Sequence, residues 1–168
     1  RRETGFRYFR EIRDRLQQAT PWEIDMVAHG SDDQRRAVLL VLMCRYYPLL
    51  HQFVRELIAW KYMGRDLHLA RYEVAAFFER KGEQHAELSE LAESSRQKLQ
   101  QVAVRILLEA RVLMKSAAAG TKSGERGFII SKPDVPLDVV FHYGNQKNYA
   151  VLELFLMGNQ EIKKLIGE

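Results

Sequence analysis

Three helix-starting signals of one kind recur in this sequence and constrain it to a largely helical fold. Each is a Ser or Thr followed three residues later by Glu or Gln, whose side chains can bond the otherwise unpaired backbone N–H groups of a helix N-terminus. They occur at Thr20 with Glu23, at Ser31 with Gln34, and at Ser94 with Gln97. Pro21 stands at the first helical position of the first signal, where its missing N–H costs nothing. We therefore expect a helix to begin at each point.

Apolar periodicity and turn residues extend these signals into a map of helices and one hairpin. The expected helices span residues 4–18, 21–29, 31–46, 48–63, 71–81, 85–91, 94–112, 136–143 and 147–157. Left-handed helix ends are expected at Gly30, Gly64, Gly82, Gly144 and Gly158. Residues 112–115 and 128–131, joined by a Gly-rich loop at 117–127, predict a β-hairpin with a long tip.

The order of these elements predicts the fold class. From Arg71 onward it is a helix, a short helix, a tight turn, a long helix and a hairpin, which is the order of a winged helix-turn-helix. The expected fold is mainly α, with an N-terminal helical bundle at residues 1–64. This bundle packs on a C-terminal winged helix-turn-helix that has one small β-hairpin and further C-terminal helices, at residues 71–168.

The electrostatics of the chain depend on where its charges gather, because 26 Lys and Arg stand against only 22 Asp and Glu, a net charge of +4. Residues 1–15 hold six Arg against three acids, and residues 114–132 hold four basic side chains against one acid. Residues 71–93 hold three basic against six acidic side chains. Two basic segments therefore flank an acidic one.

The remaining composition predicts a cytoplasmic protein that does not span a membrane. The single cysteine, Cys44, lies in an apolar run and is expected in the core, so no disulfide forms within the chain. Charged or polar residues such as Arg45 and Lys61 interrupt the most hydrophobic region before it reaches the roughly 18 residues that a membrane span needs. The aromatic residues expected in the core are Trp22, Tyr46, Tyr47, Trp60, Phe77 and Phe78.

The long helix expected at 94–112 carries the main candidate binding residues. In a winged helix-turn-helix this third helix projects, and its first turns enter the major groove of DNA. Its core-facing stripe is expected to be Leu99, Val102, Ala103, Ile106, Ala110 and Leu113. That stripe leaves polar side chains near the helix start on the outward side.

Each outward residue has an expected role in binding DNA. Ser94 and Ser95, at the positive end of the helix dipole, can place backbone N–H groups against a phosphate. Arg96 and Gln101 are candidates for contacts with base edges. The side chains expected to meet phosphates are Lys98 and Arg105.

Two further basic segments add candidate contacts. Lys122 and Arg126 lie in the hairpin loop and could reach the DNA as a wing does. In the first expected helix an apolar face, formed by Phe6, Phe9, Ile12 and Leu16, leaves arginines around the rest of the surface. The arginines proposed as a second DNA contact are Arg7, Arg10 and Arg13.

Catalytic and metal-binding patterns are missing from the sequence, so we expect no enzyme activity, no cofactor, no metal and no small-molecule substrate. The histidines are scattered, without an HExxH motif, Cys/His metal spacing or a Gly-rich phosphate loop. Glu87, Glu90 and Glu93 lie close together, which suggests a metal site or an acid–base pair. We favour instead roles in solubility and in repelling wrongly placed phosphates.

Five segments of the sequence together indicate a family. They are FFERKGEQHAELSELAESSRQKLQQVAVRILLEARVLMKS at residues 77–116, GFIISKPDVPLDVVFHYG at 127–144, and the segments at 11–16, 20–30 and 35–58. The most specific parts are SSRQKL at 94–99 and LLEARVL at 107–113. In these segments the sequence resembles the BrxA family of BREX phage-defence systems. The resemblance implies a small cytoplasmic, non-enzymatic accessory protein that binds double-stranded DNA and works with other BREX components.

Our leading hypothesis is low-specificity binding of duplex DNA, largely through phosphates. The alternative without DNA binding is that the basic face of the helix at 94–112 is an ordinary solvated surface. The hairpin loop at 117–127 would then be a simple turn. A rival hypothesis is a protein–protein assembly module of the defence complex, in which the helical half docks and the winged half is purely structural. The arginine-rich first helix leaves RNA binding as a third hypothesis.

Overall fold

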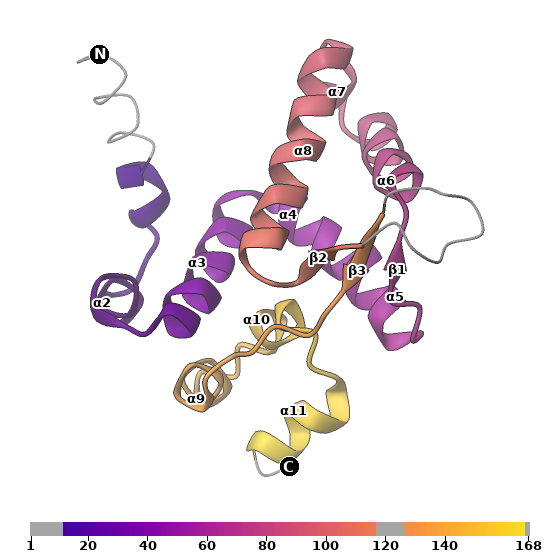
Figure 1. Ribbon diagram of the computed structural model, residues 1–168. Helices are drawn as coiled ribbons and strands as arrows, with labels where there is room; N and C mark the ends of the chain where they lie inside the picture. The colour runs from indigo at the N-terminus through magenta and orange to yellow at the C-terminus, as the bar shows by residue number, and fades with distance from the viewer. Residues whose placement is uncertain (1–11, 117–126, 167–168) are drawn as a thin grey trace.

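The computed structural model describes residues 12–116 and 127–166, which form helices around one small sheet. Residues 12–16 are helical. The elements that follow are α2 (Pro21–His29), α3 (Asp32–Tyr46), α4 (Pro48–Phe53), the π-helix η1 (Val54–Ala59), α5 (Trp60–Met63), β1 (His68–Leu69), α6 (Arg71–Gln84), α7 (Ala86–Ser89), α8 (Glu93–Glu109), β2 (Leu113–Lys115), β3 (Phe128–Ile130), α9 (Leu137–Asn145), α10 (Tyr149–Leu154) and α11 (Asn159–Ile166). In Figure 1, α8 stands above the sheet with α6 beside it, and α9 and α11 lie at the opposite end of the molecule from α7. The expectation of a mainly helical fold with a small sheet is confirmed.

Two of the three predicted helix starts are confirmed. The backbone N–H of Thr20 donates to the Glu23 carboxylate, and the N–H of Glu23 donates to Thr20 Oγ1. Ser31 and Gln34 make the same reciprocal pair at the start of α3. These bonds satisfy N–H groups that a helix leaves unpaired.

The helix predicted at 94–112 is present as α8, but the capping box predicted at Ser94 is wrong. α8 begins at Glu93, and its N-cap residue, Ala92, has no side chain that could cap it. The Gln97 amide donates to the Glu93 carboxylate (3.0 Å), an i,i+4 contact on one helix face. Because α8 starts one residue earlier than predicted, Ser94 lies inside its first turn.

Helix ends are confirmed at Gly30 and Gly64, but the left-handed conformation predicted at the glycines is wrong. Gly82 and Gly144 lie inside α6 and α9, while Gly30 and Gly64, at the ends of α2 and α5, have φ angles of −66° and −76°. Gly158 has no positive φ either. The left-handed conformation instead occurs at residues other than glycine, with φ angles between 54° and 59°. Among the described residues these are Arg65, Arg111, Lys147 and Leu156.

The sheet is antiparallel and has the strand order β1–β3–β2. Leu69 of β1 pairs with Phe128 of β3, and Leu113 of β2 pairs with Ile130 of β3. The predicted hairpin is therefore confirmed. The sequence did not predict β1, because a strand of two residues is too short to show alternation. Since Leu69, Leu113 and Ile130 are all buried, the sheet forms part of the core.

Most of the residues predicted in the core are buried or partly buried, and Trp60 is the main exception. Phe77, Phe78 and Cys44 are buried, and burial raises the pKa of the Cys44 thiol to about 12. Trp60 is 71% exposed. The π-helix η1 directly precedes it, and the wider turns of a π-helix shift the helix face that an α-helical period predicts. The predicted core position of Trp60 is therefore wrong.

A buried carboxylate joins α2 and α3 to α9, which lies far from them in sequence. Glu23 of α2 is only 1% exposed and accepts hydrogen bonds from Arg45 of α3 (2.7 and 3.0 Å) and from the Tyr143 hydroxyl of α9 (2.8 Å). Burial by itself would raise the pKa of Glu23, but the bonds from Arg45, Thr20 and Tyr143 outweigh it and lower the pKa to about 2. The buried apolar residues form one cluster from α3 to α11. The proposed division at residues 64 and 71 stays a prediction.

Candidate nucleic-acid interface

α8 is the longest helix of the described chain and has one buried and one exposed side. Its buried side is formed by Ala103, Val104 and Leu107. Val102, predicted in the core, is 48% exposed. The rest of the predicted core-facing stripe is confirmed, since Ala103, Ala110 and Leu113 are buried and Leu99 and Ile106 pack against the core.

Four of the predicted binding residues share the exposed side of α8. Ser94, Lys98, Gln101 and Arg105 follow an i, i+4, i+7, i+11 spacing, so they form one line along the helix. All four are exposed. We call this line the α8 stripe. It presents a hydroxyl, an ammonium, an amide and a guanidinium group in succession, all of which can donate hydrogen bonds.

The guanidinium group of the stripe remains accessible. Arg105 Nε donates to Glu109 Oε1 (2.9 Å), one turn further along α8. The two side chains are 79% and 66% exposed, and an ion pair of this kind contributes little because water competes for both partners. A phosphate could therefore replace Glu109 as the partner of Arg105.

Ser95 lies at the edge of the α8 stripe, and Arg96 lies away from it. Ser95 is exposed and lines a groove together with Lys98 of the stripe and the apolar Leu99. Arg96 is only partly exposed and pairs with Glu93 (3.1 Å), while its Nε is buried without a hydrogen-bond partner. The structure therefore does not bring the side chains of Arg96 and Gln101 together on one side of the helix.

The other predicted contacts are separate from the stripe or fall outside the described residues. Arg13 is exposed and pairs with its neighbour Asp14 (3.2 Å). The remaining predicted contacts lie outside the residues that the structure describes. They are Arg7, Arg10, Lys122 and Arg126.

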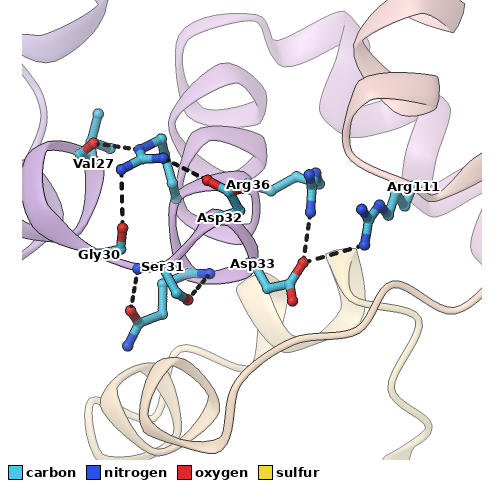
Figure 2. A network of polar contacts seen from close by, with 9 residues as sticks. Val27, Gly30, Ser31, Asp32, Asp33, Arg36 and Arg111 are labelled. Atoms are coloured by element: carbon cyan, nitrogen blue, oxygen red, sulfur yellow. Dashed lines mark hydrogen bonds and ion pairs between the residues drawn. The ribbon is translucent and has the colours of Figure 1, made fainter.

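A polar network anchors the turn after α8 to the start of α3. Figure 2 shows Asp33 of α3 between Arg36, on the same helix, and Arg111, which follows α8. The Asp33 carboxylate lies 2.6 Å from Arg36 and 3.4 Å from Arg111. Arg35 donates to the carbonyls of Val27 and Gly30. Arg111 therefore links the turn after α8 to α3, and Arg35 links the end of α2 to α3.

Sequence reasoning missed a groove of about 370 Å³ beside the stripe. Arg71, at the start of α6, lines it together with Gln97, Gln101 and Arg105 of α8. The only available signal was the polar spacing Gln97, Gln101 and Arg105 on α8. Arg71 could not be placed, since its position beside α8 depends on how α6 packs.

The described residues also define what the site does not contain. Among them, no three His, Cys, Asp or Glu side chains come close enough together to hold a metal ion. No single helix in the described ranges is long and apolar enough to cross a membrane. The bent pair formed by residues 32–46 and 48–63, with 112° between its halves, meets the length and composition criteria.

Fold and site together define a mainly helical protein with an exposed polar helix beside a small antiparallel sheet. A family model described as BrxA matches residues 1–120, so the chain belongs to the BrxA family, as its sequence resemblance indicated. It is 27% identical over 128 residues to the BREX protein BrxA of Bacillus cereus (strain H3081.97). That match covers 76% of this chain and 60% of the relative, so the chain spans well under the relative's full length.

A solved structure supports the fold. The crystal structure of an uncharacterized protein from Magnetospirillum magneticum superposes with a TM-score of 0.68. The match covers 85% of this chain and 70% of that protein, at 17% sequence identity. At this identity the similarity concerns the fold alone.

Proposed function

We propose that this protein is a non-enzymatic, cytoplasmic accessory component of a BREX anti-phage system that binds double-stranded DNA through α8. Family membership supports the place in a BREX system and makes other BREX components candidate partners. The DNA-binding part of the proposal comes from the surface of α8.

The α8 stripe is the observation that carries the proposal. The exposed side of α8 holds Lys98 and Arg105, and Gln101 stands between them. Lysine and arginine bind phosphate oxygens, and glutamine binds base edges in the major groove. A helix that is anchored along one side and polar along the other is suited to lie in that groove.

The order of elements around α8 supports a winged helix-turn-helix. α6 and α8 are joined through the short α7, and β2 and β3 follow α8 as a hairpin. In this motif the second helix of the pair enters the major groove, and the first helix crosses the DNA backbone. α8 and α6 would take these two roles.

Reversing the charges of the stripe tests the proposal. We expect Lys98→Glu combined with Arg105→Glu to weaken binding to a duplex of mixed sequence by about tenfold or more in low salt. Each lost phosphate contact should also reduce the slope of log K against log salt by about 0.9, so the double variant should lose about 1.8. Fluorescence anisotropy at several salt concentrations measures both quantities.

The matched control is Lys163→Glu with Lys164→Glu on α11. Both lysines are exposed, and the control changes the net charge by the same amount. α11 lies at the far end of the molecule from the first turns of α8 (Figure 1). If both double variants bind alike, net charge alone governs binding and α8 is not the interface. Duplex RNA of the same sequence, whose deep and narrow major groove excludes a helix, should compete poorly.

Exposed apolar side chains favour the assembly module as a second candidate function. Trp60 is 71% and Met63 is 50% exposed, and both line a groove of about 470 Å³. Tryptophan is common among the residues that dominate protein–protein binding. Capture of BREX proteins that survives nuclease treatment and is lost in Trp60→Ala, without intrinsic affinity for DNA, would favour this function over the first.

A further inference from the structure

The groove between α6, α8 and β3 has a polar rim over an apolar floor. Arg71, Gln97, Gln101 and Arg105, which line it, are exposed. The floor includes buried Val74 and Val104 and partly buried Phe128 and Leu108. The apolar floor packs α6 and the sheet against α8 and fixes the rim residues relative to one another.

The rim is suited to a partner that carries negative charge and hydrogen-bonding edges. None of the described side chains that line the groove is acidic. Gln97 and Gln101 lie one turn apart on α8, so their amides face the same way. One N–H of Gln97 bonds Glu93 (3.0 Å), which leaves its carbonyl and its second N–H available. Arg71 adds a cation from α6.

We infer that this groove is the sequence-reading part of the DNA interface, with Gln97 and Gln101 contacting base edges and Arg71 holding the flanking phosphate. The inference rests on the proposed function and adds specificity to it. Glutamine matches adenine, because its amide can accept from N6 and donate to N7. Arg71 begins α6, the helix that would cross the DNA backbone. Its guanidinium would therefore contact a DNA phosphate while α8 lies in the major groove. The interface therefore prefers DNA sites that contain adenine. This preference adds to the phosphate contacts that the amino-acid sequence predicts.

The phosphate contact is tested with Arg71→Ala. We expect a similar loss of affinity for every duplex sequence and a salt slope reduced by about 0.9, the value for one phosphate. The control is Arg80→Ala, on the same helix but outside this groove, where the guanidinium lies over the Phe77 ring at 5.5 Å. An Arg71→Ala slope equal to that of the wild type and of the control would overturn this assignment.

The base contacts are tested with Gln97→Ala combined with Gln101→Ala. The wild-type protein should enrich adenine-containing sites from a library of duplexes with a randomised core. It should bind the enriched site about fivefold or more tightly than a G·C-only duplex. The double variant should lose this preference but keep the wild-type salt slope, because it removes no charge. Circular dichroism melting of each variant confirms that it is folded.

The outcomes separate this inference from the proposed function. If the Lys98 and Arg105 reversal abolishes binding but the wild type shows no adenine preference, α8 binds DNA and the groove does not read sequence. If the preference persists in the glutamine double variant, other side chains read the bases and the inference is wrong. If the charge reversal leaves binding intact, the proposed function itself fails.

Discussion

Replacing Glu23 by Gln removes one negative charge from the most buried polar cluster of the described chain. Glu23 is 1% exposed, and its carboxylate accepts from Arg45, Tyr143 and the Thr20 N–H. The Arg45 side chain is 30% exposed. In the variant this guanidinium loses its counter-ion, and only part of the hydrogen bonding survives. We therefore expect a large loss of stability.

The pKa of Glu23 sets the size and the pH dependence of that loss. The pKa falls from 4.5 to about 2 on folding, so the folded state favours the charged form. At about 1.4 kcal/mol for each pH unit, this difference is equivalent to about 3 kcal/mol of stability at neutral pH. Because the pKa of Glu23 is lowered in the folded state, its contribution to the stability of the folded protein is complete above pH 4.5. This contribution is lost as the pH falls toward 2. At pH 3 about 2 kcal/mol should already be lost.

Urea unfolding at pH 7 and pH 3 tests this reasoning. Glu23→Gln should lower the free energy of unfolding by about 3 kcal/mol at pH 7 but by only about 1 kcal/mol at pH 3. At pH 7 this is a midpoint lower by about 1.5 M urea. Tyr143→Phe, which removes one bond to the same carboxylate, should cost about 1.5 kcal/mol.

The control is Glu87→Gln, which removes an exposed carboxylate from α7. Its difference from the wild type should be small at both pH values. If the difference between wild type and Glu23→Gln is equally large at pH 7 and pH 3, the Glu23 carboxylate is not the stabilising charge and the reasoning is refuted.

Two further predictions concern glycine positions and a buried lysine. A Cβ at Gly127 would lie 2.7 Å from the Leu69 carbonyl oxygen, so Gly127→Ala should cost about 1–3 kcal/mol by urea unfolding. Gly82→Ala, where no atom lies within 4 Å, should instead stabilise α6 by up to about 1 kcal/mol; a stabilising Gly127→Ala would contradict the close approach. Lys61 is 4% exposed and lies 2.6 Å from two carboxylates, one of them Glu73. Lys61→Met should therefore lower the free energy of unfolding by about 1–3 kcal/mol. An unchanged stability would show that the cost of burying the Lys61 charge cancels the gain from its two ion pairs.

The helix starts show which part of the fold could be predicted from the sequence. Thr20 and Ser31 each exchange two hydrogen bonds with the residue three positions further on, so the relevant partners are visible in a short window of sequence. Ser94 fits the same pattern but is not an N-cap, because α8 already begins at Glu93. Local patterns therefore predicted where helices lie better than where each one begins.

The candidate site was predictable in part. Four residues chosen from the sequence lie on the α8 stripe, because helical spacing places them on one side. Arg96 was chosen with them but lies elsewhere, and Arg71 was not chosen at all. The side of α8 that stays exposed depends on where α6 and the sheet pack, and sequence spacing carries no information about those neighbours.

Taken alone, the sequence determined the helical class, the hairpin and the family, since these depend on periodicity, capping and motifs within short stretches of chain. Tertiary structure alone decided that Glu23 meets Tyr143, 120 positions away, that β1 completes the sheet, and that Arg71 lines the same groove as Gln97. The physical reason is that burial and charge pairing act between neighbours in space. The position of those neighbours follows from how the whole chain packs into one core.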